Sequence, residues 1–227
     1  QTSKLLGTNH NEYIMTSIDL VNILENKVLM DEPFYDVSQY PTFLLSKFAS
    51  QHVKVCLSGD GGDEIFGGYN RYLINKKILN IKKFIKLLNL QSIIANQIDK
   101  EYFNYLLKKI GLSQLENKKD KLRALIYSES EEDLYEKLLR VENMDKNKNY
   151  INYQKISNLT NNFMINDTQN YLPNNILYKV DTLSMLNSLE VRAPFLDNEL
   201  FEYAWSIPYN LKFNKKKSKF ILKKILS

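Results

Sequence analysis

The fold is decided by residues 53–69, which read VKVCLSGDGGDEIFGGY. Residues 53–57 form a short β-prone run, and the loop that follows holds three glycines, two carboxylates and the hydroxyl of Ser58. A helix is expected to begin at about Glu64. Because glycine has no Cβ, the backbone N–H groups of such a loop can approach a ligand closely.

The preceding segments predict alternating helices and strands. Residues 10–15 resemble a short strand, and a helix that Thr16 can cap is expected over about 16–27. A second helix is expected over 41–51, with proline in its first turn. Strand, helix and strand in this order predict an α/β fold, with residues 53–57 as a buried parallel strand. Loops at the carboxyl ends of such strands are where α/β proteins bind nucleotides.

The remainder of the chain is predicted to be mostly helical. Residues 69–165 contain almost no glycine or proline, and in 78–90 and 120–141 apolar residues recur at intervals of three and four. That spacing favours core-facing helices over a cofactor site. We therefore expect one domain over residues 1–227, with an α/β part over about 1–72 and a helical part over about 73–227.

Composition restricts the class of protein. A single cysteine, Cys56, excludes an internal disulfide framework, and the start of the chain does not resemble a secretory leader, so a cytoplasmic protein is expected. The longest apolar stretches fall short of the roughly 20 residues that cross a bilayer. The net charge is +5, but the lysines lack interleaved aromatic residues, so we expect neither a membrane nor a nucleic-acid partner.

The glycine-rich loop does not match the common nucleotide or calcium motifs. A dinucleotide fingerprint needs a glycine where Glu64 stands, and the Gly-Lys-Ser/Thr of a Walker loop is absent. An EF-hand needs oxygen ligands spread over twelve residues. The carboxylates of Asp60 and Asp63 suit a magnesium ligand and a charged group facing a reacting centre. The alternative is a turn in which these aspartates bond their own backbone.

A second group of polar residues lies between 171 and 197. Residues 176–189 are expected to form a helix with Asp181 and Ser184 on one face, and Glu190 and Arg192 follow it. These four residues can line a substrate pocket. A structural ion-pair cluster explains them equally well.

Both motifs resemble the synthetase domain of glutamine-hydrolysing asparagine synthases. The resemblance is carried by residues 58–72 and 179–197, and GTNH at 7–10, DEP at 31–33 and Ser38 also match. It covers nearly the whole chain outside about 74–165. The form SGDGGDE resembles bacterial members of polysaccharide or secondary pathways.

The resemblance implies an adenine-nucleotide α-hydrolase-like fold and a reaction with ATP and Mg²⁺. In that reaction a carboxylate, aspartate in the family, becomes an acyl adenylate that ammonia attacks. By position, Ser58 and Gly59 would contact ATP, and Asp60 would be the catalytic residue beside the adenylate and the ammonia. Asp63 would bind magnesium together with pyrophosphate. Many members of the family carry Glu at position 60.

The resemblance also implies parts that this sequence does not contain. In the family an SGGxDS pyrophosphate loop and an N-terminal glutaminase domain that supplies ammonia precede this region, and a Lys-x-Gly-Phe segment follows it. We therefore expect the chain alone to bind ATP poorly and to form no asparagine. Lys219, Lys223 and Lys224 are expected on the surface of a helix. The alternatives are a non-catalytic helical interaction module, or a synthase of the same fold that acts on another carboxylate.

Overall fold

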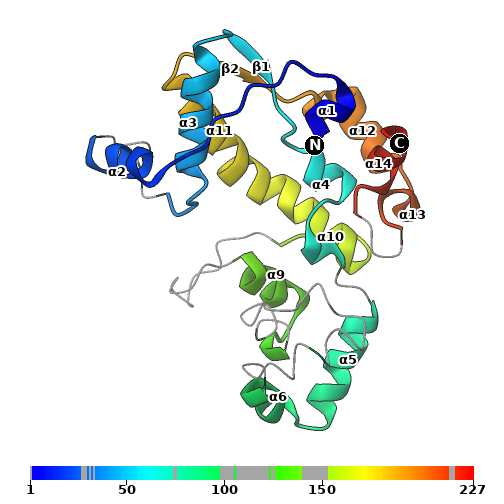
Figure 1. Cartoon of the computed structure of the whole chain (residues 1–227). Coiled ribbons are helices and arrows are strands. Elements are labelled where there is room, and N and C mark those ends of the chain that lie inside the picture. The colour runs from blue at the N-terminus through cyan, green and yellow to red at the C-terminus, as the bar shows by residue number, and fades with distance from the viewer. Residues whose placement is uncertain are drawn as a thin grey trace. The chain divides into compact units, whose positions relative to one another are not determined.

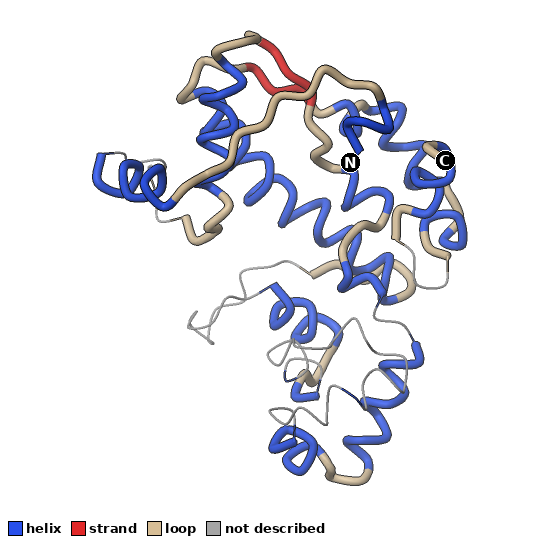
Figure 2. Tube along the Cα trace, in the orientation of Figure 1, coloured by secondary structure: helices blue, strands red, loops and turns tan. Residues whose placement is uncertain are grey.

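The computed structural model describes residues 2–26, 30, 32, 34–73, 76–97, 105, 123, 126–139, 153–214 and 218–227. They form two compact units. Unit 1 contains Gln1–Gly61 and Tyr171–Phe201, and unit 2 contains Gly62–Asn170 and Glu202–Ser227. Asp31, Pro33 and most of the helix expected over 120–141 lie outside the described residues. Figure 1 labels the elements, and Figure 2 shows the predominance of helix.

Unit 1 combines a two-stranded parallel sheet with helices. Strands β1 (Val55–Leu57) and β2 (Glu190–Arg192) pair in parallel, with Cys56 opposite Val191. The helical elements wholly within this unit are α1 (Thr2–Leu6), α2 (Ser17–Asn26), α3 (Gln39–Ser50), α11 (Tyr178–Met185) and the short 3₁₀ helix η4 (Pro194–Leu196). Helix α11 packs against both α3 and β2, so the sheet is anchored to the helical layer.

The helices of unit 1 begin close to where their capping signals predict. The Asp19 carboxylate accepts a hydrogen bond from the Thr16 backbone N–H at 2.8 Å, and the Asp19 N–H donates to the Thr16 hydroxyl at 3.3 Å. This reciprocal pair is a capping box, and it starts α2 at Ser17. Helix α3 matches the helix predicted over 41–51 to within two residues.

The prediction of a strand over residues 10–15 is wrong. That segment is irregular, and the Tyr13 hydroxyl donates to the Asp19 carboxylate at 2.8 Å. A local contact with the first turn of α2 therefore replaces strand pairing there. Strand β2, in contrast, lies in the part of the chain that was predicted to be helical.

The prediction for residues 53–57 is confirmed in direction but not in burial. Strand β1 is parallel to β2 and leads directly into Ser58. However, Val55 and Leu57 are 44% and 72% exposed. A parallel strand is buried when layers cover both of its faces, and among the described residues β1 pairs only with β2.

The predicted α/β class and the large helical portion agree with the structure. The nucleotide-hydrolase-like fold and the boundary near residue 72 between the α/β part and the helical part stay predictions.

A partly buried ion pair joins α11 to the residues before α3. The ammonium group of Lys179 donates to the Asp36 carboxylate at 2.7 Å and to the Ser38 hydroxyl at 2.6 Å. Burial raises the pKa of Asp36, but the hydrogen bonds from Lys179 and Ser38 outweigh it and lower the pKa overall. The hydrophobic core of unit 1 contains Ile23, Met30, Phe43, Leu44 and Leu183.

Unit 2 is helical in its described residues. Its elements are α4 (Gly62–Phe66), the 3₁₀ helix η1 (Asn70–Leu73), α5 (Lys76–Leu87), α6 (Gln91–Gln97), α9 (Glu131–Leu139), α10 (Leu159–Asn166), α13 (Tyr209–Lys212) and α14 (Phe220–Ile225). Two further helices cross between the units along the chain: the π-helix η3 (Asp167–Leu177) and α12 (Asn198–Ser206). Pro173 stands inside η3, and because proline donates no backbone N–H it interrupts the regular α-helical ladder.

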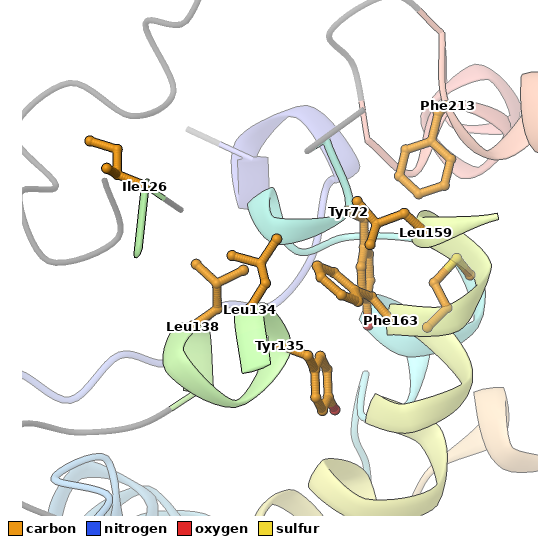
Figure 3. Close-up of a cluster of buried hydrophobic side chains, with 9 residues drawn as sticks. Tyr72, Ile126, Leu134, Tyr135, Leu138, Leu159, Phe163 and Phe213 are labelled. Atoms are coloured by element: carbon orange, nitrogen blue, oxygen red, sulfur yellow. The ribbon is translucent and has the colours of Figure 1, made fainter. Parts of the chain in front are cut away.

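The core of unit 2 is rich in aromatic side chains. Figure 3 shows it, with side chains from η1, α9 and α10 converging. Tyr135 and Phe163 have ring centroids 5.3 Å apart, and Phe213 packs edge-on against Tyr72. The buried members are Tyr72, Ile126, Leu134, Tyr135, Leu138, Leu159, Phe163, Met164 and Phe213.

The substitution Gly67→Ala is expected to destabilise unit 2. Gly67 has φ +73°, and an added Cβ would lie 2.1 Å from Cζ of the buried Phe213. The left-handed backbone and the overpacking together are expected to cost about 2 to 4 kcal/mol in free energy of unfolding. Urea unfolding followed by the fluorescence of Trp205, the single tryptophan of the chain, measures this.

Gly59→Ala is the matched control, because no atom beyond its two chain neighbours lies within 4 Å of the position that a Cβ would take. A Gly67→Ala variant as stable as the Gly59→Ala variant would contradict the packing described here.

Candidate functional site

The end of β1 positions the first half of the glycine-rich loop. The Ser58 backbone N–H donates to the Arg192 carbonyl at 2.8 Å, which extends the parallel ladder by one residue and fixes Ser58 at the carboxyl end of the strand. Gly59 is exposed, and the Asp60 N–H lies 3.5 Å from the Ser58 hydroxyl. Gly61 turns the chain with φ +83°, and a Cβ there would lie 2.3 Å from the Leu196 side chain. The loop is therefore shaped by glycine and by the sheet.

The second half of the loop opens α4 in unit 2 and carries an ion pair. Asp63 Oδ1 lies 2.9 Å from the ammonium group of Lys219, and the two side chains are 40% and 29% exposed. Lys219 directly precedes α14 and adopts a left-handed backbone conformation with φ +50°, which is uncommon for a residue with a Cβ. The expectation that Lys219 is a surface residue on a helix is wrong, whereas Lys223 and Lys224 lie exposed on α14.

Gly68 has no room for a side chain beside this ion pair. An added Cβ would lie 1.5 Å from Asp63 Oδ1 and 2.5 Å from Lys219 Cε. The Gly68 N–H also donates to the Asp63 carbonyl at 2.7 Å. The backbone of Gly68 therefore limits where the Asp63 carboxylate can lie.

The alternative that these aspartates are turn-formers receives no support from their contacts. The Asp63 side chain pairs with Lys219. Among the hydrogen bonds of the described residues, neither Asp60 nor Asp63 uses its carboxylate to accept a backbone N–H of the loop. The turn is made without the side chains that an Asx turn needs.

Glu64 is a buried carboxylate next to Asp63 that sequence reasoning missed. It is 1% exposed, and its Oε1 accepts a hydrogen bond from the Tyr69 hydroxyl at 2.7 Å. Burial raises the pKa of Glu64, against the lowering effect of the hydrogen bond from Tyr69. A glutamate in the first turn of a helix is usually a solvated partner of the helix dipole, so its type and position did not reveal this burial.

The four residues of the second motif lie in unit 1, on α11 and β2. Asp181 is exposed, and Ser184 is buried with its hydroxyl donating to the Asp181 carbonyl at 3.2 Å. Glu190 and Arg192 are largely exposed and pair with one another at 2.7 Å. The backbone of Arg192 holds Ser58, so this motif contributes to the loop through the sheet. A substrate pocket formed by the four side chains stays a prediction.

Among the described residues, Asp63 does not belong to a ready-made cluster of metal ligands. The described residues contain no group of three or more His, Cys, Asp or Glu side chains that could hold a metal ion. Magnesium commonly binds one or two carboxylates and takes its other ligands from phosphate and water. A half-exposed carboxylate beside an ammonium group fits a metal ion bound together with a phosphate.

A cavity among the described residues of unit 2 is lined by other residues. It has a volume of about 630 Å³, and none of the site residues predicted from the sequence lines it. Its walls carry four lysines and three glutamates: Lys82, Lys83, Lys86, Lys155, Glu129, Glu131 and Glu132.

In the described part of the chain, no helix is long and apolar enough to cross a membrane.

A parallel strand that ends in a glycine-rich loop with carboxylates is typical of α/β proteins that bind a phosphorylated ligand at the end of a strand. Similarity to known proteins identifies the family within this class. The chain belongs to the asparagine synthase family, whose model matches residues 1–227. No solved structure matches the chain significantly.

The chain is similar to several curated proteins. It is 30% identical to asparagine synthetase (glutamine-hydrolysing) 1 of Bacillus subtilis, over 99% of the chain and 36% of that protein. It is 31% identical to a putative asparagine synthetase (glutamine-hydrolysing) 2 of Methanocaldococcus jannaschii, over 83% of the chain and 37% of that protein. A putative asparagine synthetase (glutamine-hydrolysing) of Mycobacterium tuberculosis is 27% identical over 99% of the chain and 35% of its own length. The chain thus spans about a third of the length of these relatives.

Proposed function

We propose that the chain is the ATP-using part of an amide-forming ligase, in which a carboxylate is activated by adenylation and then attacked by ammonia. The Asp63–Lys219 ion pair carries this proposal, because it places a carboxylate and an ammonium group together at the end of the glycine-rich loop. A diphosphate with its magnesium ion needs both groups: an oxygen ligand for the metal and a cation for the phosphate oxygens. Membership of the asparagine synthase family supports the same reaction.

The residues have separate roles in this proposal. Bound ATP would supply the adenylyl group that turns the substrate carboxylate into a reactive ester. Ser58 and Gly59 would bind the nucleotide through the hydroxyl and the open backbone of the loop. Asp63 would hold Mg²⁺, and Lys219 would neutralise the diphosphate as it leaves.

Asp60 would act next to the reacting carboxyl group. Its carboxylate is half-buried and can orient the incoming ammonia and accept a proton from it, as a positioned general base does. Aspartate is one methylene shorter than the glutamate that the family resemblance implies at this position in many members. We propose that the carboxylate itself, and not its reach, is what the reaction needs.

The acceptor and the source of ammonia are proposed for the whole protein. The relatives are named asparagine synthetases and described as glutamine-hydrolysing, which supports aspartate as the acceptor and a glutaminase domain as the partner that delivers ammonia. A related carboxylate in polysaccharide or secondary metabolism is the narrower alternative. We propose a cytoplasmic location, because ATP and amino-acid pools are available there.

The diphosphate role of Lys219 is tested by titrating the 227-residue chain with magnesium pyrophosphate up to its solubility limit, because the chain alone is expected to bind such a ligand weakly but still through Asp63 and Lys219. The Gly68 amide is expected to shift in its NMR spectrum, because it lies beside Asp63. The substitution Lys219→Met is expected to weaken the apparent affinity by about tenfold or more, since a hydrogen bond to a charged group contributes about 1.5 to 3 kcal/mol.

Lys223→Met is the matched control, because Lys223 is exposed one turn further along α14. An affinity that falls equally in both variants would show only a general charge effect. A wild-type chain whose spectrum does not respond to magnesium pyrophosphate contradicts the proposed site.

A further inference from the structure

Asp167 is a fully buried carboxylate that has no part in the proposed reaction. It begins η3, is 0% exposed, and accepts hydrogen bonds from three side chains. Arg71 Nε donates to its Oδ2 at 2.7 Å, the Tyr135 hydroxyl donates to its Oδ1 at 2.7 Å, and the Tyr72 hydroxyl donates to Oδ2. Removing a charge from water costs several kcal/mol, so a buried carboxylate is kept only where strong partners satisfy it.

The donors come from separate elements of unit 2. Tyr72 lies on η1 and Tyr135 on α9, and Figure 3 shows both rings in the aromatic core. Burial raises the pKa of each tyrosine, and the charge of Asp167 raises it further. Both hydroxyls therefore stay protonated and keep donating at neutral pH, which fixes η1 and α9 to one carboxylate.

From Asp167 a series of contacts leads to the residue beside Asp63. The guanidinium carbon of Arg71 lies 4.0 Å from the ring centroid of Tyr69, a cation–π contact. The Tyr69 hydroxyl in turn donates to the buried Glu64 at 2.7 Å. The edge of the Arg71 guanidinium group therefore contacts Asp167, and its flat face contacts the Tyr69 ring.

Tyr69 is also the neighbour of Gly68, whose backbone limits the position of the Asp63 carboxylate. The Gly68 N–H donates to the Asp63 carbonyl at 2.7 Å, and its Cα carries no substituent where Asp63 Oδ1 lies. Because Tyr69 is bonded to Gly68, a displacement of the Tyr69 backbone would also displace Gly68. The contacts of Arg71 thus reach Asp63 by two routes, through Glu64 on α4 and through Gly68.

We propose that Arg71 and Asp167 form a positioning pair that, through Tyr69, Glu64 and Gly68, holds the Asp63 carboxylate half-exposed and next to Lys219. The pair does not touch the ligand. The identity of the ligand, a magnesium-bound diphosphate, rests on the proposed function, whereas the positioning itself rests on these contacts alone.

Amide hydrogen exchange in the 227-residue chain tests the positioning. The substitutions Asp167→Asn and Arg71→Lys are expected to lower the protection of the Gly68 amide by about tenfold, as the loss of one charge-assisted contact implies. Arg71→Lys is the more selective change, because lysine keeps the charge opposite Asp167 but loses the flat face that lies over Tyr69. It therefore serves as the test even where Asp167→Asn fails to fold.

Asn162→Ala is the matched control. Asn162 is as buried as Asp167 and lies in the same unit, but its side-chain oxygen accepts from the N–H groups of Ile156 and Ser157 at 2.9 Å. It is expected to expose those two amides and to leave Gly68 within about twofold of wild type. Equal loss of protection at Gly68 and at the Phe163 amide of α10 in Arg71→Lys, or no loss at Gly68, overturns the proposal.

Magnesium pyrophosphate added to the same samples separates this inference from the proposed function. Arg71→Lys is expected to weaken the response of Gly68 to the ligand by about tenfold, and Asn162→Ala is expected to leave it unchanged. A wild-type chain that does not respond refutes the diphosphate site, while the exchange data still decide whether Arg71 and Asp167 position Asp63. Equal weakening in Arg71→Lys and Asn162→Ala assigns the pair a purely structural role and also overturns the proposal.

Discussion

The substitution Asp63→Asn is expected to slow the release of pyrophosphate from ATP by about 10²- to 10³-fold, the usual effect of removing one preorganised electrostatic contact to a developing charge. Asparagine keeps the shape of the side chain but not its negative charge. It can neither neutralise a magnesium ion nor pair with Lys219, which lies 2.9 Å away. Extra magnesium should restore only the part of the activity that is lost through weaker metal binding, because the negative charge of Asp63 stays absent at every magnesium concentration.

The measurement uses a chimera in which this chain replaces the matching segment of asparagine synthetase (glutamine-hydrolysing) 1 of Bacillus subtilis. Pyrophosphate release is followed over a magnesium series. Asp133→Asn is the matched control, because Asp133 pairs with Lys137 at 2.7 Å, is similarly exposed and lies in the same unit. If the Asp63→Asn chimera is as active as the Asp133→Asn chimera, the proposal that Asp63 binds magnesium is contradicted.

The substitution Asp60→Asn is expected to lower amide formation by about 10²- to 10⁴-fold, the range in which positioned general acids and bases contribute. Dependence on magnesium should stay near that of the wild type, because Asp63 is untouched. Asp60→Glu introduces the residue that the family resemblance implies at this position in many members. It should keep substantial activity if the carboxylate is what acts on ammonia.

Amide product and pyrophosphate, measured side by side in the same chimera, distinguish the two aspartates. Asp63→Asn should lower both products, and Asp60→Asn should lower the amide more than the pyrophosphate. If both variants instead lose only thermal stability and keep their amide formation per folded molecule, the aspartates shape the turn and do no chemistry.

Much of the local structure could be predicted because local signals specify it. The capping box of Thr16 starts α2, and Pro41 lies in the first turn of α3. The loop at 58–63 was recognisable from glycine and carboxylate composition alone. Its parallel strand was recognisable as well, but not its exposure, since burial depends on which layers cover the sheet.

The parts that could not be predicted depend on residues far apart in the sequence. Strand β2 is only three residues long and follows α11 after a short turn, so it is too short to show a pattern of its own. The contacts that Asp167 makes with Arg71 and Tyr72 bridge about a hundred positions. A lysine in the sequence does not indicate a left-handed backbone conformation, which Lys219 adopts. The sequence therefore could not predict that Lys219 pairs with Asp63.

The central claim is that the loop at 58–63 belongs to a site that activates a carboxylate with ATP. Exchange of labelled pyrophosphate into ATP by the chimera tests it most directly, because exchange requires reversible adenylation. We expect exchange that needs both magnesium and aspartate, or a related carboxylate, and that Asp63→Asn slows by about 10²- to 10³-fold. A folded chimera that shows no exchange with any of these carboxylates, while the Bacillus subtilis parent does, would contradict the claim, and so would exchange that Asp63→Asn leaves intact.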